Sequence, residues 1–396
     1  LTIFIGQQST GKSTIMKIFC FCCWVEKYCI AHGNVKWFGS YQHFYKTLKS
    51  FHHFPDNFFT AGRSSIEYQG EFLHIKFRYS GRKTNAEIIP FPNFTEAYNT
   101  KLCFIPSERN LISSVKNVDA TYRVKSIDNI FNYLMEWDSV KRHYNKDHYL
   151  KLTFLHGMEF YYDSKNSREV IRLSPEKEIT PYYASSGVQS SYSLYVMLDY
   201  LTHRVFDQNA SFSRKDINSL IFDLLKEEKI TADRPFDEIR EQLGSRLAHR
   251  LQYKASRIFI EEPEQNLYPT AQADLIRNIV RMINTASDRT GNETKVCITT
   301  HSPYIVSVIN VLIQGYEAMR KDKGEALQIL PEEELLSFDQ VKCYYVDEKG
   351  MVEPLMRKDK DVSMMDAAIL DGVSDQLDDW MYRFNLILSK NDGYDA

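Results

Sequence analysis

Glycine and proline are scarce in this chain of 396 residues, with 16 and 12 copies, and no apolar run approaches the roughly 18 residues that a membrane-spanning helix requires. This scarcity, beside 13% aromatic residues, excludes a disordered chain. Because no secretory leader is recognisable, we expect a cytoplasmic protein without a membrane partner. The net charge of -3 excludes a chain-wide basic surface, although basic residues outnumber acidic ones near the start and the reverse holds near the end.

The cysteines number seven, and this odd count argues against a disulfide scaffold. Four of them lie close together in the sequence, at Cys20, Cys22, Cys23 and Cys29. Their spacing matches no usual pair of zinc ligands, and the stretch FCFCCWV is typical of the buried face of a helix. We therefore expect these thiols to pack as small apolar side chains.

A short apolar strand, LTIFI, leads directly into the pattern G-x-x-x-x-G-K-S, which begins at Gly6. The two glycines allow successive N–H groups to point inward around an anion, and the helix that follows adds its positive end. Lys12 would then reach the β- and γ-phosphates of a nucleotide, and the Ser13 hydroxyl would ligate Mg²⁺. The alternative is a glycine-containing surface turn. The predicted nucleotide-binding residues of this loop are Gly6, Gln7, Gln8, Ser9, Thr10, Gly11, Lys12, Ser13 and Thr14.

Two adjacent glutamates, Glu261 and Glu262, follow the apolar run IFI in the stretch RIFIEEPEQNLYP. Ligands of open α/β sheets bind at the carboxyl ends of strands, where this pair stands. Because neighbouring strand residues point to opposite sides, the two carboxylates need different roles. We predict that Glu261 holds Mg²⁺ and that Glu262 is the general base. The alternative is a solvated acidic turn before a helix that begins near Pro269.

A third buried strand is predicted in KVCITTHSPYIV, and it ends just before His301. An imidazole can donate a proton to developing charge near neutral pH. His301 is therefore predicted to sense the γ-phosphate or the attacking water, and the alternative is a structural histidine.

The order of these motifs resembles that of ABC-type ATPase heads, and more narrowly the SMC-like branch that includes OLD-family and anti-phage defence ATPases. The last 60 residues resemble the end of the ATPase component of the PARIS anti-phage system. The resemblance implies an α/β fold: an ABC/SMC-type P-loop ATPase head with a mixed β-sheet core, an antiparallel β lobe and helical insertions. Two positions depart from the family pattern. Glu261 stands where Asp is common, and the Mg²⁺-sensing glutamine has no clear match.

The family also implies a signature segment before the acidic strand, and YYASSGVQSSYSL meets that demand. Its nucleotide-contacting residues would be Ser185, Ser186, Gly187 and Gln189. Related sequences further imply that Glu108 and Arg109, in the segment PSERN, lie near the nucleotide or the subunit contact. For this pair the alternative is a salt-bridged strand exit.

The whole chain, 1–396, is expected to form a single head, with one or more strands before Leu1. Alternating runs within 34–100 predict antiparallel strands. Helical insertions are expected at 110–150, with Ser126 as a cap, and at 212–252. Residues 340–396 are expected to form a strand pair and an acidic helix. The acidic side chains of that helix favour a solvated or docking face over a metal cluster; they are Asp371, Asp375, Asp378 and Asp379.

The resemblance implies an enzyme that binds and hydrolyses ATP with Mg²⁺, the nucleotide lying between two heads of a homodimer or higher homo-oligomer. In the anti-phage relatives such a switch controls a separate effector in trans, a nuclease or toxin, and a phage-encoded trigger is conceivable. The rivals are a DNA-repair or recombination ATPase that clamps DNA, a transporter subunit, and an assembly scaffold that binds ATP without hydrolysis. The adenine-contacting residue is expected upstream of Leu1.

Overall fold

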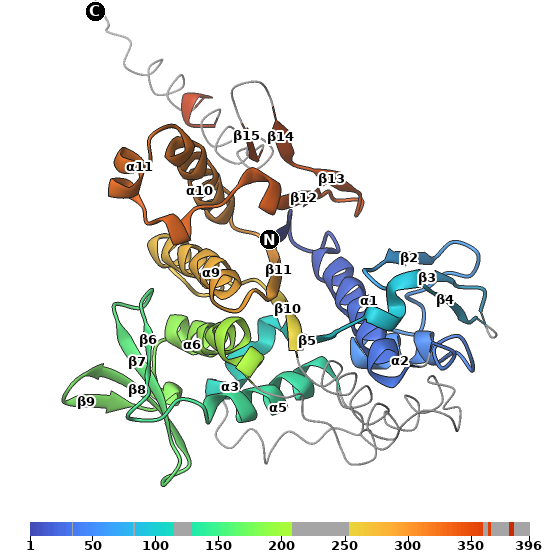
Figure 1. Ribbon diagram of the computed structural model, residues 1–396, viewed down its shortest axis with the longest axis horizontal. Coiled ribbons are helices and arrows are strands. Elements are labelled where there is room, and N and C mark those ends of the chain that lie inside the picture. Colours follow the sequence, from blue (N-terminus) through green and yellow to red (C-terminus); the bar gives the residue numbers. More distant parts are fainter. Residues whose placement is uncertain are drawn as a thin grey trace, which may run out of the picture.

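A six-stranded sheet forms the centre of the computed structural model, in the order β13-β12-β1-β11-β10-β5 (Figure 1). The model describes residues 1–33, 35–81, 84–114, 128–207, 253–358, 363–365 and 380–383. Five strands are parallel, and β13 (Val352–Pro354) runs antiparallel to its neighbour β12. The parallel strands are β1 (Thr2–Ile5), β5 (Asn99–Ile105), β10 (Tyr253–Glu261), β11 (Glu293–Thr300) and β12 (Lys342–Val346).

Alternating side chains of the central strands enter two different hydrophobic cores. Ile3 and Ile5 of β1 belong to the core on one face of the sheet, whereas Phe4 belongs to the core on the other face. In β10, Ile260 and Phe259 divide in the same way. A strand that is buried on both sides must be apolar at successive positions, which explains the continuous runs TIFI and IFI.

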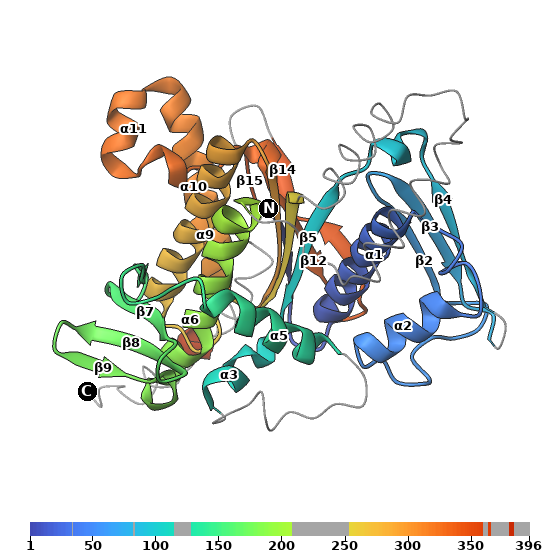
Figure 2. The same cartoon turned by 60° about the horizontal axis from the view of Figure 1, so that its bottom comes forward.

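One face of the sheet is covered by α1 (Lys12–His32), the helix that follows the P-loop (Figure 2). Its cysteines at 20, 22, 23 and 29 are buried and free, as the sequence predicts. Beyond α1 lies the predicted antiparallel lobe, a three-stranded sheet with an aromatic core. This lobe consists of α2 (His43–Phe51), β2 (Ser65–Gln69), β3 (Leu73–Arg78) and β4 (Ala86–Pro90).

The opposite face of the sheet is covered mainly by α6 (Ser186–Asp199), α9 (Pro269–Thr290) and α10 (Pro303–Lys321) (Figure 2). A separate four-stranded antiparallel sheet, which the sequence analysis does not foresee, packs at the edge of this layer. Its strands are β6 (Leu150–Leu152), β7 (Met158–Asp163), β8 (Arg168–Ser174) and β9 (Lys177–Ile179). The other α-helices of the described residues are α3 (Leu111–Ser114), α5 (Asn129–Lys141) and α11 (Lys323–Ile329). No helix among the described residues is both long and apolar enough to span a bilayer.

The predicted helical insertions are described only in part. Within 110–150, helix α5 is capped by Asp128, whose carboxylate accepts a hydrogen bond from the Phe131 amide, and not by Ser126, which lies outside the described residues. The 212–252 insertion and the acidic side chains from Asp371 to Asp379 also lie outside them.

Within the C-terminal segment, Met364 and Met365 belong to a strand. This strand, β15 (Ser363–Met365), pairs antiparallel with β14 (Met356–Lys358). The backbone of Met365 exchanges two hydrogen bonds with the Asn310 side chain of α10, and its own side chain is fully buried. Met364 and Met365 are therefore held by strand β14 and by helix α10.

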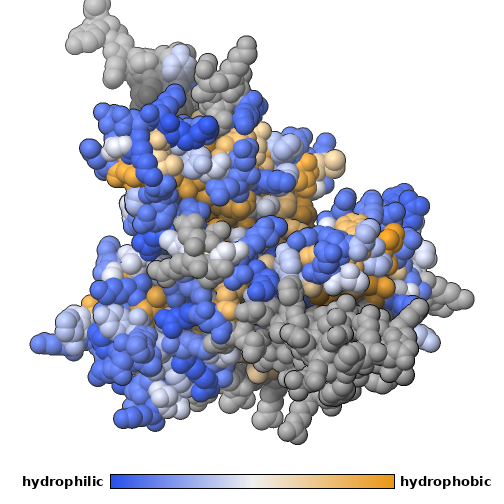
Figure 3. All heavy atoms as spheres, viewed as in Figure 1, coloured by the Kyte–Doolittle hydropathy of each residue, from blue (hydrophilic) through white to orange (hydrophobic). Residues whose placement is uncertain are grey.

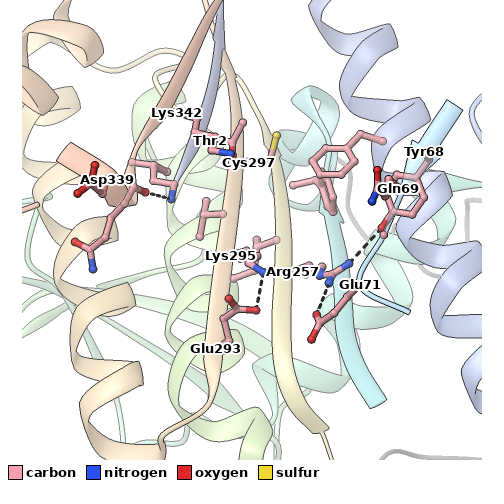
Figure 4. A pocket seen from close by; sticks show the side chains of 17 residues that line it. Thr2, Tyr68, Gln69, Glu71, Arg257, Glu293, Lys295, Cys297, Asp339 and Lys342 are labelled. Carbon is pink, nitrogen blue, oxygen red and sulfur yellow. Dashed lines mark hydrogen bonds and ion pairs between the residues drawn. The ribbon is translucent and has the colours of Figure 1, made fainter. Parts of the chain in front are cut away.

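A buried ionic network joins the antiparallel lobe to the central sheet (Figure 4). Arg257 of β10 lies 3.2 Å from Glu26 of α1 and 3.2 Å from Glu71, and Tyr68 donates to Glu26 at 2.8 Å. A Cβ atom at Gly70 would overlap the Glu26 carboxylate, so a side chain at that position would displace the network. A cavity of about 510 Å³ beside the network is lined by the first residues of the central strands, and so lies at the sheet edge opposite the P-loop.

Candidate functional site

The loop between β1 and α1 adopts the conformations that its glycines predict. Gly11 has a φ of 99° at the helix N-cap, a left-handed conformation that a side chain would strain. A Cβ atom at Gly6 would overlap the carbonyl oxygen of Val346 at the end of β12. Gln7, Gln8 and Ser9 are exposed, whereas Thr10 and Lys12 are buried. The loop therefore offers its outer backbone to solvent while its lysine lies inside.

The Lys12 ammonium group is held by the loop itself. Its Nζ atom donates to the carbonyl oxygens of Gly6 at 2.9 Å and Gln7 at 2.5 Å, and it lies 3.2 Å from Nδ1 of His301. Burial lowers the pKa of Lys12 to about 8, and the nearby carboxylates of Glu262 and Glu264 oppose that shift. A phosphate entering the loop would replace the two carbonyl acceptors by charged oxygens, so the site holds its cation in readiness for an anion.

Glu261 ends β10 with a buried carboxylate, 2% exposed, in the position predicted for the metal side of the site. It accepts from the Ser107 amide at 3.3 Å and lies 3.8 Å from the ammonium group of Lys17 on α1. Burial raises its pKa, while Lys17 and a hydrogen bond from Ser13 act in the opposite direction. Mg²⁺ favours oxygen ligands and keeps several waters, and the Ser13 hydroxyl and the Glu261 carboxylate are oxygen donors that fit this preference.

Glu262 and His301 meet on the other side of the strand end. Glu262 has a φ of 44°, an uncommon value for a side chain larger than glycine, and its amide donates to Thr299 at 2.9 Å. This turn carries its carboxylate to 3.1 Å from Nε2 of His301, while Nδ1 lies 3.1 Å from the Gly6 carbonyl. Both side chains remain about one third exposed, at 34% and 28%. The two glutamates therefore face different groups, Glu261 toward Lys17 and Glu262 toward His301, and their roles as metal ligand and general base stay predictions.

Glu264 is a site residue that sequence reasoning does not single out. Its Oε1 atom accepts from the Thr300 hydroxyl at 2.7 Å and from the His301 amide at 2.9 Å. Its Oε2 atom is buried and has no hydrogen-bond partner among the described residues. The spacing EEPE, two residues beyond Glu262, is the one signal that could have indicated it. Glu264 therefore fixes the backbone from which His301 projects.

Arg109, expected near the nucleotide or the subunit contact, lies beside the end of β10 and points its guanidinium at backbone carbonyls. Its side chain is 1% exposed, and its guanidinium donates to four backbone carbonyls at distances of 2.6 to 3.2 Å. Those acceptors belong to Pro106, Ser190, Glu261 and Glu262. A guanidinium that is engaged in this way ties the strand end of β10 to helix α6, and it presents no free edge to a phosphate. Glu108, by contrast, is exposed and accepts from Ser107 at 3.0 Å.

The signature residues form the exposed start of α6. Ser185 is the N-cap residue, and Ser185 and Ser186 are both exposed. Gly187 is packed so closely that a Cβ atom would lie 2.9 Å from the Asn266 carbonyl oxygen. The Gln189 side chain donates to the carbonyls of Pro181 and Tyr182 and so holds the entry turn rather than extending to a ligand.

Three comparisons with known proteins bear on the identity of this site. No curated protein matches the chain. The crystal structure of an SmcHead bound to the C-winged helix domain of ScpA is similar at 11% identity with a TM-score of 0.35, and the match covers 92% of this chain and 90% of that chain. A family model described as an AAA ATPase domain matches residues 82–306, a range that starts after the P-loop and includes Glu262 and His301. Because that range is more than half of the chain, the protein belongs to the AAA ATPase domain family and is an ATPase.

Proposed function

We propose that this ATPase is a nucleotide-controlled switch, with each ATP bound between two copies of the chain. The supporting observation is that, within one chain, the predicted signature residues do not contact the other predicted motifs. The P-loop, Glu262 and His301 converge through direct contacts, whereas Ser185 and Ser186 are exposed at the start of α6 and bind none of these groups among the described residues. Helix N-termini attract anions, so the start of α6 is suited to a phosphate held by another copy.

The chemistry assigned to this chain uses groups already in place. Lys12 and the loop amides hold the phosphates, and Mg²⁺ bound by Ser13 and Glu261 would neutralise charge on them. The Glu262 carboxylate accepts a proton from the attacking water. His301, with Nε2 beside Glu262, orients that carboxylate and lies close enough to Lys12 to respond to the γ-phosphate.

A complementation experiment tests the shared site. We expect Lys12→Ala and Ser186→Arg each to abolish ATP hydrolysis, the first by removing the phosphate cation and the second by blocking the start of α6. A mixture of the two variants should recover up to roughly a quarter of wild-type activity, because half of the dimers are mixed and each contains one intact site. No recovery in the mixture would contradict a site that is shared between copies.

The substitution Glu262→Gln separates an enzyme from a passive scaffold. It should lower ATP turnover at least about 100-fold while ATP binding persists, and it should trap the ATP-bound dimer in sedimentation experiments. The matched control is Glu317→Gln, a substitution on the exposed side of α10. Equal and negligible turnover by the wild type and the Glu262 variant would favour the scaffold.

We further propose that the switch serves anti-phage defence of the OLD and PARIS type by holding or releasing an effector in trans. The support is the order of the motifs and the segment around Arg109, which resemble that branch. Cells that carry the gene with its neighbours should resist phage, and cells with the Lys12→Ala variant should not. Neighbouring permease genes, or resistance that does not require Lys12, would contradict this role. DNA clamping remains the rival, and it predicts DNA binding that weakens steeply with salt.

A further inference from the structure

A second polar cavity, of about 760 Å³, lies among β6, the end of α6 and α9. Its lining shares no residue with the P-loop cluster or with the start of α6. Cavities that hold small molecules usually measure about 300–1,000 Å³, so its size suits such a ligand. The cavity needs an explanation other than nucleotide hydrolysis.

Helix α6 ends at this cavity in a π-helical turn, Tyr200–Arg204. Turns of this kind are rare in proteins, and those that occur are often found at functional sites. The extra residue redirects the side chains that follow it. Here His203 and Arg204 both line the cavity. Nε2 of His203 lies 3.1 Å from the Thr285 hydroxyl, so the imidazole joins the turn to α9.

Three cationic side chains from three elements line the cavity, Lys151, Arg204 and Arg281, together with two carboxylates, Asp199 and Asp207. Arg204 lies 3.7 Å from Asp199 and is therefore partly neutralised. Lys151 and Arg281 form no ion pair with any acidic side chain among the described residues. Their two charges are thus available to a ligand.

An amide oxygen, and not a carboxylate, positions Arg281. Oδ1 of Asn278 accepts from Arg281, from the Thr153 hydroxyl at 2.7 Å and from the Tyr195 hydroxyl at 3.1 Å. The amide nitrogen of Asn278 in turn donates to the Asp274 carbonyl at 2.7 Å, which fixes its orientation. A guanidinium held in this way is oriented without losing its charge.

We propose that this cavity binds a small phosphate-bearing anion through Arg281 and Lys151. A guanidinium binds phosphate through two parallel hydrogen bonds, and a phosphate group offers three strong acceptor oxygens where a carboxylate has two. The lobe that carries β6–β9 is mostly hydrophilic on the face seen in Figure 3, which suits a polar ligand.

Inorganic pyrophosphate is the probe, and its binding is measured by calorimetry on the full chain. The Lys12→Ala background removes the P-loop cation, so the remaining binding reports the second cavity. Adding Arg281→Gln should weaken pyrophosphate binding at least roughly tenfold, and Lys151→Gln should weaken it less, because lysine is a single mobile charge. The matched control is Lys177→Gln on β9 of the same lobe, which should leave the affinity unchanged.

Arg281→Lys provides a second variant with an intact charge, and partial binding by this protein would support the proposal even if Arg281→Gln unfolds. Four outcomes would overturn it. These are the absence of pyrophosphate binding in the Lys12→Ala protein, equal binding with and without Arg281, stronger competition by citrate than by phosphate, and an Arg281 dependence that appears for single-stranded oligonucleotides only. The last two would assign the cavity to a carboxylate or to a nucleic-acid backbone.

Discussion

The Nε2 atom of His301 lies 3.1 Å from Oε1 of Glu262, and the opposite ring nitrogen lies 3.2 Å from the Lys12 ammonium group. With its proton on Nε2, a neutral His301 ring donates to Glu262 and accepts from Lys12 at Nδ1, whereas a proton on Nδ1 would be donated to the Gly6 carbonyl. The ring therefore connects the group that holds the phosphate to the group that receives the proton.

Replacing His301 should reduce turnover more than ATP binding. His301→Ala is expected to lower kcat about 100-fold with little change in KM, because the ring orients the Glu262 carboxylate. His301→Gln, which can still donate to Glu262, should retain more activity. Steady-state kinetics measure both values, and His148→Ala, at an exposed position, serves as the control. A rise in KM at constant kcat would assign His301 to binding alone.

The affinity for ATP should fall above about pH 8 because the pKa of Lys12 is lowered to about 8 by burial. Below that pH the ammonium group is already charged. Between pH 8 and its ordinary range, phosphate binding must restore the proton, and affinity should fall by up to about tenfold per pH unit. Calorimetry at pH 8.5 to 9 in two buffers of different ionisation enthalpy should show proton uptake. Lys12→Arg should abolish this uptake because arginine stays charged. Affinity that is constant from pH 7 to 9.5 would contradict the prediction.

Substitution of Glu264 should act through His301. Glu264→Ala removes the acceptor of the Thr300 hydroxyl and the His301 amide, so we expect kcat to fall about 10- to 100-fold. Glu264→Gln keeps an acceptor oxygen and should retain most of the hydrogen bonding, but it removes a negative charge near Lys12. Its pH profile for ATP binding should therefore shift to lower pH. If both variants behave as the wild type across pH 6.5 to 9, Glu264 has no positioning role.

Arg109→Lys should destabilise the fold strongly despite conserving the charge. A lysine has one point charge and no planar fork, so most of the four carbonyls would lose their donor. The free energy of unfolding should fall by about 3 kcal/mol. Urea denaturation measures the change, with Arg63→Lys as the exposed control. A loss below about 0.5 kcal/mol would show that the buried guanidinium is dispensable.

The buried imidazole of His52 should make the protein sensitive to acid. Burial lowers its pKa to about 3, and both ring nitrogens are buried without a hydrogen-bond partner among the described residues. Only the unfolded chain takes up a proton between pH 6.5 and 3, so stability should fall with decreasing pH in this window. The loss at pH 5 should be about 2 kcal/mol relative to pH 7. His52→Phe should remove this part of the pH dependence in urea titrations, and equal slopes for both proteins would contradict it.

The sequence was sufficient to predict the central strands and the opposite directions of the Glu261 and Glu262 side chains, because these depend on local patterns. An apolar run that ends in Glu261 and Glu262 specifies both a buried strand and two opposite side-chain directions. The role of Arg109 depends instead on carbonyls at Pro106, Ser190 and the two glutamates, which the fold brings together from distant segments. No local sequence pattern predicts that Arg109 contacts these carbonyls.

The antiparallel sheet β6–β9 escaped prediction for a related reason. Two of its four strands, β6 and β9, have only three residues each, too short for alternation to be distinguished from a loop. Similarly, Ser126 is the predicted N-cap of the helix and Asp128 is the observed one. Both residue types cap helices about equally well. Asp128 also lies 3.1 Å from the His53 side chain, a tertiary contact that the local sequence does not indicate.

The position of β1 between β11 and β12 affects the order in which the chain can fold during synthesis. Thr2 pairs with Cys297 and with Lys342. The strand β1 can therefore pair only after roughly 300 further residues have been synthesised. At about 5–20 residues per second this delay is roughly 20–70 s. The antiparallel lobe, with strands that follow one another closely and a core of its own, has all its partners early. The strand that leads into the P-loop therefore gains its neighbours only after β11 and β12 have been made, and until then the apolar segment TIFI lacks both partners.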